Sequence, residues 1–151
     1  MSQYQVSSGF FLPLKSPQTI LFVFSRLYDR WWAKYLSGFN HMAMAIVLDK
    51  DYVIVIEPWY SHCSVTCRTY PAPGEWDKWK VVELTVVPTN KQKLVRPVMQ
   101  TCATLCQYLG GVNLGCILPN SLYNTIVSRS AEWLKDKGIQ GVKIWEPQQC
   151  Q

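Results

Sequence analysis

The apolar positions in the first half of the chain follow the pattern of short β-strands. Residues 41–48 and 52–57 are apolar at nearly every position, and the polar triplet at 49–51 separates them. This pattern predicts a hairpin whose strands are covered on both faces, at the centre of a sheet. Four other short segments also have the composition of strands: residues 19–25, 63–67, 80–87 and 142–145. In the segment 63–67, alternation places Cys63, Val65 and Cys67 on one face of a half-exposed strand.

The second half of the chain changes to the period of a helix. Between residues 99 and 109 the apolar side chains recur at i, i+3, i+4 and i+7: Cys102, Leu105, Cys106 and Leu109. This stripe predicts an amphipathic helix that ends at Gly110-Gly111. Shorter helical segments are predicted at residues 28–36, 122–127 and 131–137. Strands followed by helices predict an α+β fold with a mainly antiparallel sheet and helices on one face.

Length and composition narrow the class of protein. A chain of 151 residues with 48% apolar content predicts a single domain over residues 1–151, with its core at about residues 19–146. The net charge of +5 comes from scattered Lys and Arg, which argues against a nucleic-acid partner. No apolar run is long enough to span a bilayer, and the best candidate, residues 20–24, is far too short. Because residues 1–19 lack the features of an export signal, we expect a cytoplasmic protein whose six cysteines are reduced.

The cysteine at the start of the predicted main helix has a special position. Thr101 is a natural N-cap, which places Cys102 in the first turn, where free backbone amides and the helix dipole stabilise a thiolate. We therefore expect a lowered pKa for this thiol. The alternative is that Cys102 and Cys106 only pack against the sheet, as buried free cysteines commonly do.

His41, one of two histidines, lies at the start of the predicted hairpin. Alone, it could be a core histidine with satisfied hydrogen bonds. Together with Cys102 it supplies the imidazole that nucleophilic thiol chemistry requires. If the hairpin pairs residues whose numbers sum to about 98 or 99, His41 lies opposite residue 57 or 58, so Glu57 is a candidate to orient the ring. The alternative for Glu57 is a carboxylate in solvent at the end of a strand.

Other chemical groups give weaker signals. His62, Cys63 and Cys67 lack a second pair at metal-ligand spacing, so we expect no metal, and no organic cofactor is implied. The segment LGGVNLGC has no Lys-Ser/Thr ending and is not a phosphate loop. Five tryptophans are candidates to line a groove or a partner surface, beside their default role in the core: Trp31, Trp32, Trp59, Trp76 and Trp79.

The segment TCATLCQYLGGVNLGCILPNSLYNTI resembles the nucleophile helix and following loop of papain-like cysteine hydrolases of the circularly permuted NlpC/P60 type, particularly those encoded by tailed bacteriophages. A cysteine opens a helix that ends in Leu-Gly, and a loop with a proline leads to a short helix with a Leu-Tyr pair. FNHMAMAIVL and YVIVIEPW resemble the histidine strand and its hairpin partner. The likeness covers roughly residues 19–128, although glutamate is not the commonest third residue in this family.

The resemblance implies a cysteine hydrolase that cleaves a peptide or amide bond, in a cell-wall peptide or a protein. Cys102 would be the nucleophile, His41 the base and Glu57 the third polar residue. The backbone N–H of Cys102 would stabilise the oxyanion, and Gln100 would help with its side chain. Two alternatives stay open: a structural or adaptor component of a phage particle, in contact with other phage proteins, that keeps the fold without activity, and a lipid acyl hydrolase or acyltransferase.

Overall fold

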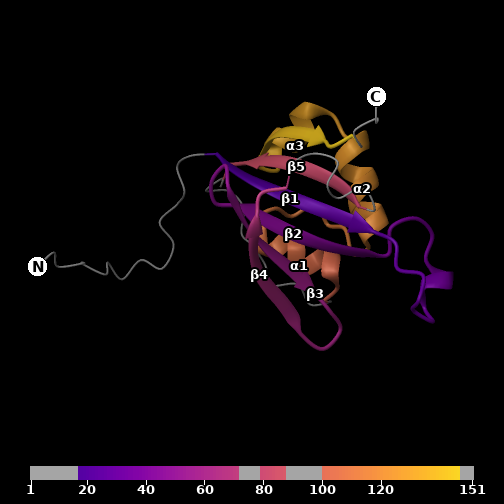
Figure 1. Cartoon of the computed structure of the whole chain (residues 1–151). Helices are drawn as coiled ribbons and strands as arrows, with labels where there is room; N and C mark the ends of the chain where they lie inside the picture. Colours follow the sequence, from indigo (N-terminus) through magenta and orange to yellow (C-terminus); the bar gives the residue numbers. More distant parts are fainter. Residues whose placement is uncertain (1–16, 72–78, 88–99, 147–151) are drawn as a thin grey trace, which may run out of the picture.

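The computed structural model describes residues 17–71, 79–87 and 100–146. Six strands form one antiparallel sheet in the order β4-β3-β2-β1-β5-β6 (Figure 1). The strands are β1 (Gln18–Ser25), β2 (His41–Val47), β3 (Tyr52–Pro58), β4 (Cys63–Thr69), β5 (Lys80–Val86) and β6 (Ile139–Ile144). The helices are α1 (Cys102–Leu109), α2 (Pro119–Ser128) and α3 (Ala131–Asp136). The predicted α+β class with a mainly antiparallel sheet is therefore confirmed.

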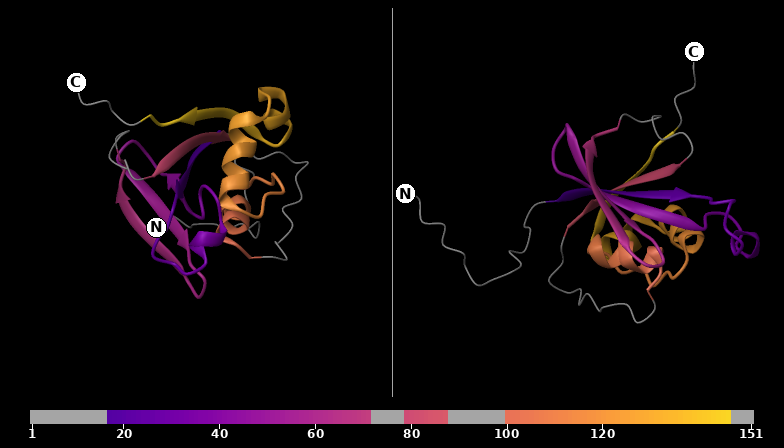
Figure 2. Two further views of the ribbon diagram at one scale, coloured as in Figure 1. Left: turned by 90° about the vertical axis from the view of Figure 1, so that its right-hand side faces the viewer. Right: turned by 60° about the horizontal axis from the view of Figure 1, so that its bottom comes forward.

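The three helices lie on one face of the sheet (Figure 2). Apolar side chains of the sheet fill the layer between them, including Phe22, Met42 and Met44, together with Leu122 and Ile126 of α2. Strands β2 and β1 hold the two central places, which explains why the hairpin predicted at 41–57 is apolar on both faces. Within the described residues, no helix is both long enough and apolar enough to cross a membrane.

The opposite face of the sheet carries a second apolar layer, which the curvature of the sheet helps to close. Leu21, Ala45 and Val53 lie in this layer with Trp145. The rings of Tyr70, just after β4, and Trp145, just after β6, lie 6.0 Å apart edge to face. The two outermost strands of the sheet therefore approach each other at one corner (Figure 2).

The β2–β3 register differs from the prediction. Paired residues have numbers that sum to 100, as in Met44 with Ile56, and not 98 or 99. The predicted turn at residues 49–51 does form, since Leu48 N–H donates to Tyr52 O, and its three residues place position 48 opposite position 52, which gives a sum of 100. Continued to the start of β2, this register places Trp59 opposite His41 and leaves Glu57 on the diagonal, which a long side chain can still span.

The helical stretch predicted at 28–36 is mostly wrong. Only a 3-10 turn forms there, at Ala33–Tyr35. A short helix depends on packing for its stability, and here only Ala33 of the turn is buried, while Tyr28 and Trp31 are exposed. The helices predicted at 122–127 and 131–137 are confirmed, with slightly different ends.

The buried face of α1 is also rotated from the predicted stripe. The buried residues are Ala103, Cys106 and Gln107, while Leu109 is 45% exposed. Gln107 is buried because its side chain fastens the loop that follows the helix. Its Nε2 donates to Ala103 O and Cys116 O, at 3.0 and 2.6 Å, and its Oε1 accepts from Leu114 N–H at 3.0 Å.

Replacement of Gln107 by Leu should destabilise the fold by about 2–4 kcal/mol. The change removes three hydrogen bonds and leaves loop amide and carbonyl groups in a buried place without a partner. Urea unfolding measures the effect. Gln140→Leu is the matched control, because Gln140 is exposed on β6 and should change stability by less than about 0.5 kcal/mol. Equal stability of the two variants would contradict the role assigned to Gln107.

Candidate active site

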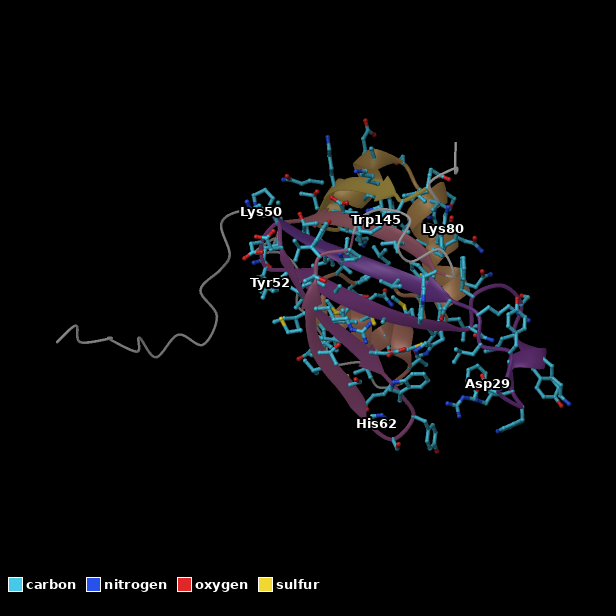
Figure 3. All side chains as sticks on the ribbon, viewed as in Figure 1. Asp29, Lys50, Tyr52, His62, Lys80 and Trp145 are labelled. Atoms are coloured by element: carbon cyan, nitrogen blue, oxygen red, sulfur yellow. The ribbon has the colours of Figure 1, made fainter. Side chains whose placement is uncertain are left out.

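A cavity of about 770 Å³ opens where the start of β2, the end of β3 and the start of α1 meet. His41, Cys102 and Gln100 all line it, together with aromatic and polar side chains of the neighbouring loops. His62 lies on its wall at the β3–β4 turn (Figure 3). Three of the four residues proposed from the sequence as an active site therefore share one cavity, although Cys102 and His41 are sixty-one positions apart in the chain.

The N-terminus of α1 is built around Thr101, as predicted. Thr104 N–H donates to Thr101 Oγ1 at 3.1 Å, and Thr101 N–H donates to Thr104 Oγ1 at 2.8 Å. This reciprocal pair is a capping box, with threonine in the place usually taken by Glu or Gln. The Thr101 hydroxyl also donates to Ile117 O at 2.7 Å. The cap therefore places Cys102 as the first residue of the helix, at the cavity.

The lowered thiol pKa expected from the helix position is wrong for Cys102. Burial raises the pKa of this thiol above its usual value, and this is the largest effect. Hydrogen bonds from the backbone N–H groups of Met42, Ala103 and Cys102 itself act in the opposite direction and lower it. The sequence identified the helical amides correctly, but it could not show how far β2 removes the sulfur from water. The thiol is therefore held mainly in its neutral form near pH 7.

The bond from Met42 also places the thiol close to the backbone of β2. Met42 directly follows His41 in β2, so the sulfur lies near the strand one position along the chain from His41. The thiol and the imidazole form no hydrogen bond with each other in the described part of the chain. Both residues line the same cavity.

The imidazole of His41 is buried and bonded to Glu57. Its Nε2 lies 3.0 Å from Glu57 Oε1. An ionised carboxylate can only accept, so Nε2 carries the proton and Nδ1 keeps a lone pair. Within the described residues Nδ1 has no hydrogen-bond partner. In this tautomer of the neutral ring, Nδ1 is the nitrogen that can accept a hydrogen bond.

The aromatic ring of Trp59 covers His41. The two rings stack with centroids 4.5 Å apart and an interplanar angle of 24°. The guanidinium of Arg30 lies 5.7 Å from the Trp59 ring centroid. Trp32 and Trp59 both line the cavity, as was expected of some tryptophans. Trp79 packs against the sheet, Trp31 is exposed, and Trp76 lies outside the described residues.

Two polar residues near His41 were missed by sequence reasoning. Asn40 lines the cavity and bonds through its side chain to both backbone groups of Leu27. Ser25 pairs with His41 in the β1–β2 register, and its buried Oγ has no hydrogen-bond partner within the described residues. The signal in the sequence was a polar residue at the end of each apolar run, which is also typical of ordinary strand ends.

The other described cysteines do not line the cavity of His41 and Cys102. Cys63 and Cys67 are exposed on β4, with Val65 on the same face as predicted, while Cys106 and Cys116 are buried. All five described cysteines are free thiols. The described residues contain no group of three His, Cys, Asp or Glu side chains placed to hold a metal ion.

Comparison of the chain with protein-family models, with curated proteins and with solved structures gives no match.

The raised pKa predicts an unusual order of reactivity among the thiols. At pH 7, iodoacetamide should alkylate Cys102 more slowly than Cys63 and Cys67, and the rate at Cys102 should rise at higher pH than theirs. The reason is that alkylation requires the thiolate, whose fraction falls when burial raises the pKa. Peptide mass mapping after timed labelling measures each site. Labelling in urea is the control, where the difference should disappear. Fastest labelling at Cys102 in the folded protein would contradict the prediction.

Proposed function

We propose that the protein is a cysteine hydrolase that cleaves a peptide or amide bond through an acyl-enzyme. The observation that carries this proposal is the 3.0 Å contact between His41 Nε2 and Glu57, which leaves Nδ1 of the neutral ring available as a base in a residue that lines the same cavity as Cys102. Trp59 supports the assignment because its stacked ring limits the access of water to the imidazole. In a core histidine kept only for packing, no such free nitrogen would be needed at a cavity wall.

The proposed reaction begins with a neutral thiol. The Cys102 sulfur attacks the carbonyl carbon while Nδ1 of His41 takes the thiol proton, so no stored thiolate is required. The imidazolium is stabilised by Glu57 and gives its proton to the leaving amine as the C–N bond breaks. A thioester between Cys102 and the acyl group remains. Water, deprotonated by the same nitrogen, then attacks the thioester and releases the acid and the free thiol.

The oxyanion of the tetrahedral intermediate needs hydrogen-bond donors at the start of α1. The backbone N–H of Cys102 is one candidate, because the first amides of a helix have no partner within the helix. Gln100 is a second, since its side chain is exposed and lines the same cavity. In this assignment the capping box acts as a positioning device, because it holds the amide and the sulfur in one fixed relation.

The papain-like architecture is part of the same proposal. In that architecture a cysteine at the start of a helix faces a histidine on an antiparallel sheet, and a neighbouring strand supplies the third polar residue. Here α1 packs on β2 and β3, and these strands carry His41 and Glu57. This arrangement and the motifs at residues 39–59 and 101–126 support a permuted NlpC/P60-like protein, with a peptide or amide as substrate.

A second candidate is a non-catalytic structural protein that keeps the same fold, such as a component of a phage particle. The observations in its favour are the raised pKa of Cys102 and the absence of a hydrogen bond between the thiol and His41 in the described chain. In this case Cys102 is a packing residue and its neighbours have no role in proton transfer. The two candidates predict different outcomes when the protein reacts with an acylating reagent.

Acylation by p-nitrophenyl acetate should occur at Cys102 and depend on His41. Attack on an ester is assisted by the base, so His41→Ala should slow acylation by about 100-fold or more. His62→Ala is the matched control, because it removes the other histidine of the same cavity and should leave the rate within about twofold. The nitrophenol burst gives the rate, and peptide mass mapping gives the acylated residue.

Acylation spread over the exposed Cys63 and Cys67, with no effect of His41→Ala, would favour the structural protein. Circular dichroism of each variant checks that the fold is intact. Loss of the burst in Cys102→Ala, with the burst kept in Cys63→Ala, completes the assignment of the nucleophile.

Replacement of Glu57 by Gln should lower the same acylation rate by about 100-fold. The side-chain amide of glutamine can donate to Nε2, which moves the ring proton to Nδ1 and removes the base. It also removes the charge that stabilises the imidazolium. The exposed Glu132→Gln on α3 is the control and should react as the parent protein does. An unchanged rate in Glu57→Gln would remove Glu57 from the proposed site and leave Cys102 and His41 to be judged separately.

A further inference from the structure

A loop between β1 and β2 projects from the body of the protein and exposes aromatic rings. This aromatic loop, residues 26–38, extends beyond the sheet in Figure 1 and in the right-hand view of Figure 2, and Asp29 marks it in Figure 3. Tyr28, Trp31 and Tyr35 are 82%, 79% and 70% exposed. Rings of this size in water are unfavourable for a free soluble protein, so a group of them at one projection indicates a surface that meets something else.

The base of the aromatic loop is fastened by specific hydrogen bonds. The Arg26 guanidinium donates to Leu36 O and Gly38 O, at 3.0 and 2.5 Å. The Asn40 side chain accepts from Leu27 N–H at 2.8 Å and donates to Leu27 O at 3.0 Å. These bonds join the two ends of the loop. The exposed rings therefore belong to a loop whose two ends are fixed in place.

Gly38 shows how tightly the two ends of the aromatic loop are packed against the rest of the protein. Its backbone has φ +65°, and a Cβ atom there would overlap the side chain of Asn120 on α2. The same Asn120 accepts from Phe39 N–H at 3.2 Å. The loop is thus tied to the helical layer as well as to the sheet, which makes its orientation part of the fold.

Basic side chains accompany the rings. Arg26 lies 5.5 Å from the Tyr28 ring centroid, and Lys34 lies 4.9 Å from that of Tyr35. With Arg30 the loop has three cations against the single carboxylate of Asp29, so its net charge is 3 − 1 = +2. Aromatic rings beside cations suit the boundary between water and lipid, where rings enter the headgroup layer and cations meet phosphates.

We propose that the aromatic loop docks the protein on the surface of an anionic lipid bilayer. A stable protein partner usually covers about 800 Å² on each side, and a narrow projection with three exposed rings offers no flat surface of that kind. Insertion into a headgroup layer needs only a few rings and a positive charge. The observations therefore favour an anionic membrane surface over a protein as the partner.

Docking would also orient the candidate active site. Leu27, Arg30 and Trp32 belong to the aromatic loop and line the cavity of Cys102 and His41. The cavity would then lie close to the headgroup layer, within reach of a substrate at the membrane surface. The docking itself goes beyond the proposed hydrolase and does not depend on Cys102.

Vesicle co-sedimentation of the full chain tests the proposal. Binding to vesicles of phosphatidylcholine with phosphatidylglycerol should exceed binding to phosphatidylcholine alone and should weaken as salt is added. Trp31→Ala should weaken the binding by about tenfold, because the largest exposed ring is lost. Lys34→Gln should weaken it by about fivefold, the effect of one lysine near an anionic surface.

Matched controls lie at the other end of the sheet, where Figure 3 labels Tyr52 and Lys50. Tyr52 is an exposed aromatic residue and Lys50 an exposed cation, so Tyr52→Ala and Lys50→Gln should bind as the parent protein does. Cys102→Ala should also bind normally, and this separates docking from the hydrolase reaction. Circular dichroism confirms that each variant is folded.

Three results would overturn the proposal: no binding to anionic vesicles, equal binding to neutral vesicles, or equal losses in the loop variants and their controls. The first result, obtained with folded protein, would leave a protein partner as the use of the exposed rings. A failure of the acylation experiment, by contrast, has no effect on vesicle binding, so the two proposals fail separately.

Discussion

The β2–β3 turn is the constraint on which the candidate site depends. Asp49 Oδ1 accepts from the N–H groups of Asp51 and Tyr52, at 2.7 and 2.9 Å, and this tightens the turn to three residues between paired positions. The register that follows brings Glu57 to the imidazole and Trp59 above it. A slip by one residue would move both side chains to the other face of the sheet. The contacts of His41 with Glu57 and Trp59 at one end of the hairpin therefore depend on the Asp49 carboxylate at the other end.

The start of α1 shows two opposing effects on one thiol. The helical amides and the Met42 N–H favour a negative sulfur, whereas removal from water disfavours it, and burial has the larger effect on the pKa of Cys102. A site of this kind relies on a base that acts during the reaction and not on a thiolate formed beforehand. In the proposed hydrolase the Glu57–His41 pair would provide such a base, because the carboxylate would stabilise the imidazole at the moment when it becomes charged.

Much of this fold could be predicted from the sequence, because periodicity and capping are local. The hairpin, the strand at residues 19–25 and the Thr101 cap follow from neighbouring residues alone. The pKa of Cys102 could not be predicted, since it depends on how deeply β2 buries the sulfur. The burial of Gln107 was also beyond reach, because its three partners lie in a loop whose path is set by tertiary packing. At residues 28–36 the sequence has helical propensity, but too few of these residues are buried for packing to stabilise a helix.

The site residues show the same division between local and distant effects. His41, Cys102 and Gln100 were placed at one cavity by reasoning about residue types and order, and Glu57 was found despite an incorrect pairing sum. The turn at residues 49–51 was predicted correctly, but its three residues give a sum of 100 and not 98 or 99. The length of the glutamate side chain compensated for the difference. Asn40 and Ser25 gave no signal, since nothing local distinguishes them from polar residues at other strand ends.

The contact between Tyr70 and Trp145 has a consequence for the behaviour of the molecule in concentrated solution. Outer strands of an open sheet present unpaired backbone groups that can recruit another chain. At this corner the rings that follow β4 and β6 touch across the concave face. An incoming strand would first have to separate the two rings. Their contact therefore opposes edge-to-edge aggregation at the corner where the edge strands β4 and β6 come close together.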